Sequence, residues 1–129
     1  MRLLWTNPTP YSASPTAFLA QTINIDLSGY DGVIIEGAYS TDHSKDAMPT
    51  DRRTIFYLEK GWSANPNYGM YNTSNDLWVT FRPTTISNNS VAFGSGSYKS
   101  PGQPAGVTNN NVAIPIHIWG VKNAIEYLT

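Results

Sequence analysis

The chain has 129 residues, of which 13% are charged, and its formal net charge is −1. A chain of this length favours one domain, and it holds no cysteine for disulfide, zinc or thiolate chemistry. The weak charge gives no electrostatic attraction for nucleic acid or an anionic membrane surface. No apolar run approaches the ~20 residues of a membrane span, and Met1–Pro10 has no apolar stretch long enough for a signal peptide.

Low charge, many β-forming residues and frequent Gly and Pro are typical of an all-β protein. Arg2–Trp5 is a short apolar segment. The predicted strands follow in chain order: Gln21–Leu27, Val33–Glu36, Thr54–Lys60, Leu77–Arg82, Thr84–Ile86, Val91–Phe93 and Val112–Val121. About seven strands at short spacing predict one antiparallel domain over residues 1–129, a β-sandwich or jelly roll.

The strand at Leu77–Arg82 alternates between two sets of side chains. The alternation predicts Leu77, Val79 and Phe81 in the core, and Trp78, Thr80 and Arg82 facing out. An outward Trp78 has three roles open to it: stacking on a ligand, packing under the preceding segment, or burial in a subunit interface.

The clearest turn signal is Ser87-Asn88-Asn89-Ser90, between two short strands. Asn tolerates positive φ, so Asn88-Asn89 predicts a two-residue type I′ hairpin turn. In the last predicted strand, Pro115 has no N–H to donate, which places that strand at a sheet edge or gives it a bulge there.

The segment Gly61–Trp78 is rich in aromatic residues and asparagine and holds one charged residue, Asp76. Its Gly, Pro and Asn content predicts a long surface loop, and loops often carry function. Aromatic rings cover the C–H faces of sugars, and Asn amides both donate and accept hydrogen bonds. The predicted ligand-binding residues are Trp62, Asn67, Tyr68, Tyr71 and Trp78; the alternative is that these rings pack over the edge of the core.

Motifs for catalysis are missing: there is no G-x-S-x-G, H-E-x-x-H or Walker sequence. His43 lies between carboxylates, but its spacing matches no standard metal loop and favours a solvated segment. His117, between two isoleucines, is predicted to be a hydrogen-bonded structural histidine. The carboxylates Glu36, Glu59 and Glu126 are scattered and give no glycosidase pair. The sequence therefore predicts no enzyme, no cofactor and no metal site.

Four segments are similar to small structural proteins of tailed phages: LLWTNPTP at 3–10, FLAQTINIDLSGYDGVIIEG at 18–37, TFRPTTISNNSVAFGSG at 80–96 and NNNVAIPIHIWGVK at 109–122. Such proteins, or C-terminal domains, are encoded near the tail-fibre and baseplate genes of phages and prophages of Gram-positive bacteria. The resemblance spans most of the chain, and its motifs are structural. The chain departs from it at 123–129, NAIEYLT, which extends beyond the usual end.

The resemblance implies a virion protein, made in the host cytoplasm, that assembles with other virion proteins as a homo-oligomer, a trimer. Receptor-binding domains of this kind generally bind cell-wall polysaccharide through Tyr-, Trp- and Asn-rich loops. The first hypothesis is therefore a tail-fibre or baseplate-type domain that binds host cell-surface glycan. The alternative is an architectural virion protein, such as a head-decoration, head-fibre or collar protein, with no ligand of its own.

Overall fold

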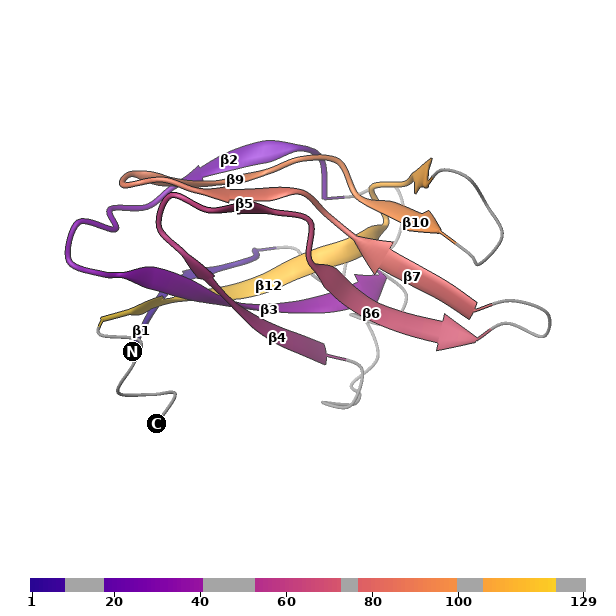
Figure 1. Cartoon of the computed structure of the whole chain (residues 1–129), viewed down its shortest axis with the longest axis horizontal. Coiled ribbons are helices and arrows are strands. Elements are labelled where there is room, and N and C mark those ends of the chain that lie inside the picture. Colours follow the sequence, from indigo (N-terminus) through magenta and orange to yellow (C-terminus); the bar gives the residue numbers. More distant parts are fainter. Residues whose placement is uncertain (9–17, 41–52, 73–76, 100–105, 123–129) are drawn as a thin grey trace.

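The computed structural model describes residues 1–8, 18–40, 53–72, 77–99 and 106–122 (Figure 1). These residues form twelve strands in three four-stranded sheets, and every strand pair is antiparallel. The predicted β-sandwich is confirmed, and the jelly-roll topology stays a prediction.

One layer is a sheet with the strand order β1-β12-β3-β4. Its strands are β1 (Arg2–Thr6), β12 (Val112–Val121), β3 (Gly32–Ser40) and β4 (Arg53–Glu59). It forms the lower layer in Figure 1. The strand β12 is central, between β1 and β3, so the edge position predicted from Pro115 is wrong. The predicted bulge is confirmed, because the β12–β3 register shifts between Pro115 and His117.

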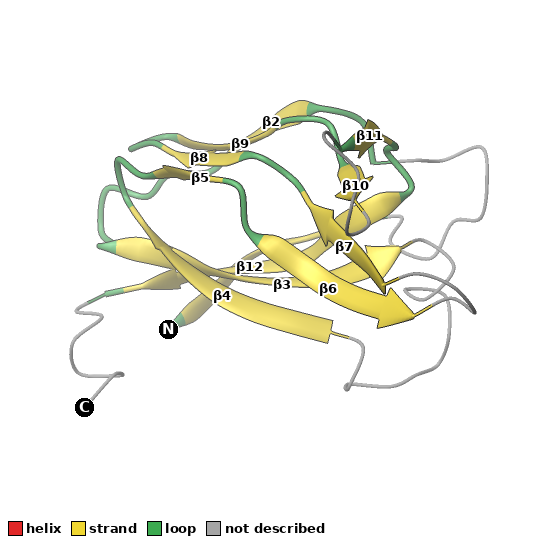
Figure 2. Ribbon diagram, turned by 45° about the vertical axis from the view of Figure 1, so that its right-hand side comes forward, coloured by secondary structure: helices red, strands yellow, loops and turns green. Residues whose placement is uncertain are grey.

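The other layer consists of two sheets, made of different strands, that lie end to end (Figure 2). One has the order β2-β9-β8-β5, with bounds Gln21–Asn24, Ser90–Phe93, Thr84–Ile86 and Ser63–Ala64. The other has the order β11-β10-β7-β6, with bounds Val107–Thr108, Ser97–Lys99, Leu77–Phe81 and Asn67–Asn72.

The chain crosses between these two sheets three times, each time through a short segment that interrupts the strands. We call these three segments together the bend. The segments lie between β5 and β6, β7 and β8, and β9 and β10, and they contain Pro66, Pro83 and Gly94. Proline removes a ladder donor, which explains two of the interruptions. The N–H of Gly94 donates to the carbonyl of Pro83 at 2.8 Å, so two of these segments are joined side by side.

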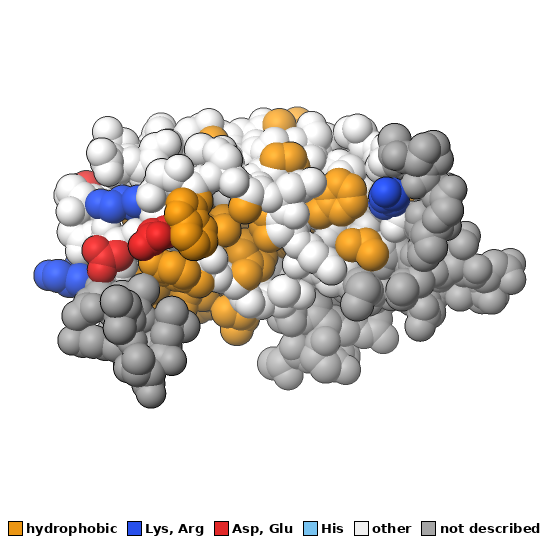
Figure 3. Space-filling model, viewed as in Figure 1, with side chains coloured by type: hydrophobic (Ala, Val, Ile, Leu, Met, Phe, Trp, Pro, Cys, Tyr) orange, Lys and Arg blue, Asp and Glu red, His pale blue; other side chains and the backbone are white. Residues whose placement is uncertain are grey.

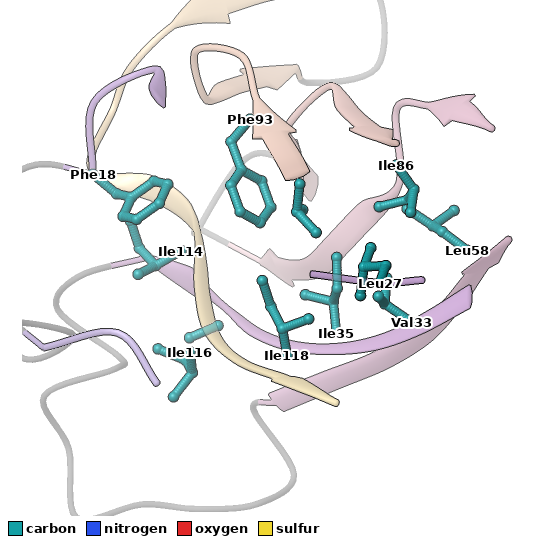
Figure 4. Close-up of a cluster of buried hydrophobic side chains, with 12 residues drawn as sticks. Phe18, Leu27, Val33, Ile35, Leu58, Ile86, Phe93, Ile114, Ile116 and Ile118 are labelled. Carbon is teal, nitrogen blue, oxygen red and sulfur yellow. The ribbon is translucent and has the colours of Figure 1, made fainter. Parts of the chain in front are cut away.

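The core lies between the two layers (Figure 4). Its buried members come mainly from β3, β8, β9 and β12: Phe18, Leu27, Val33, Ile35, Ala38, Leu58, Ile86, Val91, Phe93, Ile114, Ile116 and Ile118. The strand predicted at Val112–Val121 is confirmed with these bounds. Its isoleucines are buried and His117 and Trp119 are partly exposed, but before the bulge Ala113 and Pro115 are buried as well.

The predicted hairpin β8–β9 is confirmed, with Ile86 opposite Val91. The type I′ turn is wrong, because that turn needs positive φ at both central residues, and Ala113 is the only described non-glycine residue with positive φ. The carbonyls of Asn89 and Asn88 instead accept hydrogen bonds from the N–H groups of Ile25 and Leu27, at 3.0 and 2.9 Å. These tertiary bonds set the turn conformation.

The predicted faces of β7 are wrong for the described side chains. Thr80 and Arg82 are completely buried, whereas Val79 and Phe81 are partly exposed. Alternation separates the two faces of a strand but leaves open which face lies inside. Here the polar face is buried because the protein supplies it with partners; Thr80 Oγ1, for example, donates to the carbonyl of Gly69 at 3.1 Å.

Candidate binding surface

The segment Gly61–Trp78 is mainly strand, so its prediction as a long loop is wrong. It contains β5, β6 and the start of β7. The strands β6 and β7 form a hairpin in which Tyr71 pairs with Trp78. The side chains of Tyr71 and Trp78, like residues 73–76, lie outside the described part of the chain, and so do His43 and Glu126.

Tyr68 was predicted to contact a ligand, but it is 0% exposed and that assignment is corrected. Its ring packs edge-on against Phe56, with centroids 5.1 Å apart. It also covers Gly37, where a Cβ would come within 2.4 Å of the ring. The absence of a side chain at Gly37 therefore provides the space that the ring fills.

The phenol of Tyr68 is an unusual group for a core. Burial raises its pKa above the ordinary tyrosine value. Its hydroxyl oxygen is inaccessible and makes no hydrogen bond of good geometry among the described residues, although Thr84 and the charge of Arg82 act on it and partly offset the rise in pKa. Tyr68 therefore stabilises the interior by its ring and weakens it by its hydroxyl.

Asn67, another predicted ligand contact, is exposed. Its Oδ1 accepts a hydrogen bond from the N–H of Gly69 at 2.8 Å. Gly69 has φ 138° and follows the register shift between Asn67 and Gly69. The side chain of Asn67 thus stabilises the start of β6, which gives it a structural role.

Trp62 is the predicted site residue whose described position suits ligand contact, because 49% of it is exposed. It lies on a fixed turn after β4: its N–H donates to the carbonyl of Glu59 at 3.1 Å, and its carbonyl accepts from Ile86 at 2.9 Å. Gly61, with φ 89°, allows this turn. The Trp62 ring meets the ring of Tyr57 at an interplanar angle of 67°, with centroids 6.5 Å apart.

Ser63, the residue that follows this tryptophan, belongs to a pair of hydroxyl groups on two neighbouring strands. Ser63 and Thr85 face each other in the β5–β8 ladder, and their hydroxyl oxygens are 2.9 Å apart at an exposed position. A half-exposed ring and a pair of exposed hydroxyl groups are side chains that suit a neutral, hydroxyl-rich ligand. We refer to Tyr57, Trp62, Ser63 and Thr85 as the Trp62 site.

A second surface was missed by the sequence reasoning: the outer face of the β1-β12-β3-β4 sheet, which points away from the core. The ladders place two rows of residues across it: Leu3, Trp119, Ile34 and Tyr57 in one row, and Thr6, His117, Glu36 and Ile55 in the other. Leu3 and Ile55 are 49% and 64% exposed. Figure 3 shows hydrophobic side chains gathered along β4 and the turn after it.

One polar pair interrupts this apolar surface. His117 Nδ1 and Glu36 Oε1 are 2.8 Å apart, with both side chains partly buried. The imidazole also lies 5.3 Å from the ring of Trp119. The prediction of a hydrogen-bonded structural His117 is confirmed. The described residues contain no group of three or more His, Cys, Asp or Glu side chains that could hold a metal ion.

Arg82, predicted to face solvent, is instead 0% exposed at the bend. Its guanidinium donates to backbone carbonyls: Nε to Ala113 at 2.7 Å, Nη1 to Gly94 at 2.7 Å, and Nη2 to Val112 at 3.1 Å. It also lies 5.1 Å from the ring centroid of Phe18, a cation–π contact. Burial lowers the pKa of Arg82 to about 10, so it stays charged at neutral pH.

The Arg82 site explains two local features of the backbone. Ala113 adopts φ 55°, a costly conformation for a non-glycine residue, and its carbonyl is the acceptor for Nε. Gly96 is also fixed: a Cβ there would lie 2.5 Å from the carbonyl oxygen of Val112 and 2.7 Å from Arg82 Nη2. Arg82 is therefore a structural clamp between the bend and β12.

Searches against family models, curated proteins and solved structures found no match for this chain. No helix among the described residues is long and apolar enough to cross a membrane.

Proposed function

We propose that this protein is a non-catalytic, architectural virion protein that contacts other protein subunits through the outer face of the β1-β12-β3-β4 sheet. The observation that carries the proposal is the row of apolar side chains on this outer face, in which Leu3 is exposed and Ile34 and Trp119, on adjacent strands, are partly exposed. Exposed apolar surface of this kind is typical of protein interfaces. The virion assignment is supported by the sequence resemblance to tailed-phage structural proteins.

The geometry also favours a protein partner over a small ligand. The face is built from rigid neighbouring strands and presents side chains in rows. The His117–Glu36 pair supplies a fixed polar contact within it. A polar pair inside an apolar patch gives orientation and specificity to an interface.

The test is association with the other virion proteins of the phage or prophage that encodes the chain. Leu3→Glu places a charge on the outer face and is expected to weaken capture at least tenfold. Val107→Glu, at an exposed site on the edge strand β11, is the matched control and should bind as the unaltered protein does. Equal capture of both variants would contradict the proposal, provided that circular dichroism shows both folded.

A second function, binding of host cell-surface glycan, is favoured by the Trp62 site. The half-exposed indole and the neighbouring hydroxyls suit stacking and hydrogen bonding to a sugar. Binding per site is expected to be weak and to gain strength from several copies of the protein.

This function is tested by adding purified host cell-wall polysaccharide and following tryptophan fluorescence. Trp62→Ala should abolish the response, while Leu19→Ala, at an exposed position on a different part of the chain, should keep it. A response that survives in Trp62→Ala, or no response in the unaltered protein, would exclude the Trp62 site.

A further inference from the structure

Among the described strands, β4 lies at one edge of its sheet. In the described residues it pairs with β3 on one side alone, and it lies toward the viewer in Figures 1 and 2. Its seven residues keep a continuous register with β3, from Glu59 opposite Gly32 to Arg53 opposite Ala38. The opposite edge strand, β1, has a register shift between Leu3 and Trp5.

Natural edge strands usually carry features that prevent pairing with another chain, such as bulges, proline or central charges. The strand β4 has no proline or bulge, and its charged residues stand at its two ends. Near its middle is Ile55, the most exposed large apolar residue among the described residues, at 64%. This edge therefore has the properties of a pairing strand.

The sequence of β4 is complementary to itself when the strand is reversed. An antiparallel pairing centred on Phe56 uses all seven residues and keeps each side chain on its own face of the sheet. It places Arg53 opposite Glu59, Thr54 opposite Leu58, Ile55 opposite Tyr57, and Phe56 opposite itself. Each end of the ladder thus pairs residues of opposite charge.

We propose that two copies of this chain associate through β4, forming a two-fold dimer with one continuous eight-stranded sheet. The ladder satisfies the exposed backbone groups of both edges. The most exposed apolar side chain, Ile55, gains a tyrosine as its cross-strand neighbour, a favourable pairing. Opposite charges at positions 53 and 59 favour this register, because shifting one β4 strand by two residues along the other would separate both charge pairs.

The pairing also extends the outer face. Each copy carries two rows of outer-face residues: one begins at Leu3 and ends at Tyr57, and the other begins at Thr6 and ends at Ile55. Because Tyr57 of one copy lies opposite Ile55 of the other, the Leu3 row of each copy continues into the Thr6 row of the second copy. A dimer would therefore present the outer face as one surface, although the inference does not depend on the proposed function.

Charge reversal tests the dimer. Sedimentation equilibrium would compare the full chain with Arg53→Glu, Glu59→Arg and the double variant. Each single change puts like charges opposite each other at two places in the dimer and is expected to raise its dissociation constant about tenfold. The double variant restores opposite charges and should return to the original value.

Several outcomes would overturn the inference. They are a monomeric unaltered protein at the highest soluble concentration, a trimer that is insensitive to the single changes, or a double variant as weak as either single one. Circular dichroism of each variant separates loss of pairing from loss of fold. Leu3→Glu should leave the dimer intact, which distinguishes this inference from the proposed subunit contact.

Disulfide trapping tests the register, because the chain has no cysteine of its own. Directly opposite residues bring their Cα atoms to about 5 Å, within the range of a disulfide. Ile55→Cys mixed with Tyr57→Cys should therefore form a cross-linked dimer of unlike chains. Ile55→Cys alone puts the two cysteines about 8 Å apart and should cross-link poorly. Stronger cross-linking of the like chains would refute the register.

Discussion

The two ends of the interior are stabilised in different ways. At one end, Leu27, Ile35 and Ile118 pack as aliphatic side chains between the layers (Figure 4). At the bend, the buried side chains include Arg82 and Thr80, which donate hydrogen bonds to backbone carbonyls. We call these the aliphatic end and the polar end.

The difference shows what each kind of packing achieves. Apolar burial stabilises in proportion to area and tolerates hydrophobic substitutions that conserve volume. Hydrogen bonds from a guanidinium have fixed directions, so Arg82 holds the bend and β12 in one arrangement. The aliphatic end stabilises the fold by apolar burial, whereas the polar end stabilises it through directed hydrogen bonds that also determine its geometry.

Removal of the clamp is expected to have the largest effect on stability. Arg82→Ala should lower the free energy of unfolding by about 4 kcal/mol, because it leaves a cavity and buried carbonyls without donors. Arg82→Lys should cost less, since it keeps the charge but loses the planar fork. Urea unfolding followed by circular dichroism measures both. A loss below about 1 kcal/mol for Arg82→Ala would show that the polar end is not a clamp.

Truncation at the aliphatic end should follow the rules of cavity formation. Ile118 is completely buried, so Ile118→Ala should cost about 3 kcal/mol and Ile118→Val about 1 kcal/mol. The same unfolding experiment gives both values. The distinction between the two ends is supported if the loss of unfolding free energy at Ile118 grows with the number of carbon atoms removed, while Arg82→Ala causes a larger loss in one step. Equal losses for Ile118→Ala and Ile118→Val would argue against it.

Tyr68 offers a change that should improve the polar end. Tyr68→Phe keeps the ring against Phe56 and removes a buried hydroxyl that makes no hydrogen bond of good geometry among the described residues, so stability should rise by about 1 kcal/mol. Since burial raises the pKa of Tyr68 in the folded protein, the unfolded chain loses this proton first at alkaline pH.

The pH dependence provides a control for the same variant. The part of the unfolding free energy that depends on the Tyr68 proton should be fully present below about pH 10, the ordinary tyrosine pKa. It should fall as the pH rises above that value. Tyr68→Phe should flatten this fall. If the fall is unchanged in the variant, other tyrosines are responsible, and the hydroxyl is not isolated.

The smallest effect is expected at a surface turn that supports the aliphatic end. The N–H of Ser28 donates to Asp26 Oδ1 at 2.9 Å, next to the buried Leu27, and this bond lowers the pKa of Asp26. The stabilisation is present above the unfolded pKa and is lost as the pH falls through the lower folded pKa.

Asp26→Asn should therefore be slightly less stable than the unaltered chain at neutral pH, and the two should converge below about pH 4. Thermal unfolding at a series of pH values makes the comparison. A difference that persists at pH 2 would assign the effect to something other than the charge of Asp26.

Much of the fold was predictable because the periodicity of a strand is a local property of the sequence. The strand at Val112–Val121 and the hairpin around Ser87–Ser90 were both predicted correctly. The burial of Arg82 was not predictable, because its acceptors are carbonyls up to 31 positions away in the chain. Burial of Tyr68 likewise depends on Gly37, which lies opposite it only in the folded protein.

The candidate site was predictable in part for the same reason. Trp62 was found from composition and is 49% exposed, and its contact with a ligand stays a prediction. The outer face was missed because its rows join side chains from strands far apart in the sequence, such as Leu3 and Trp119. A pattern that lies across strands leaves no signal along any one of them.

The central position of β12 has a consequence for folding during synthesis. Asn7 donates to the carbonyl of Pro115, 108 positions later, and β12 pairs with both β1 and β3. The first strand therefore lacks its neighbour until the ribosome has released β12. Such a high contact order is typical of folding in milliseconds to seconds. The emerging chain thus carries uncovered strands for most of its translation, when chaperones are most needed.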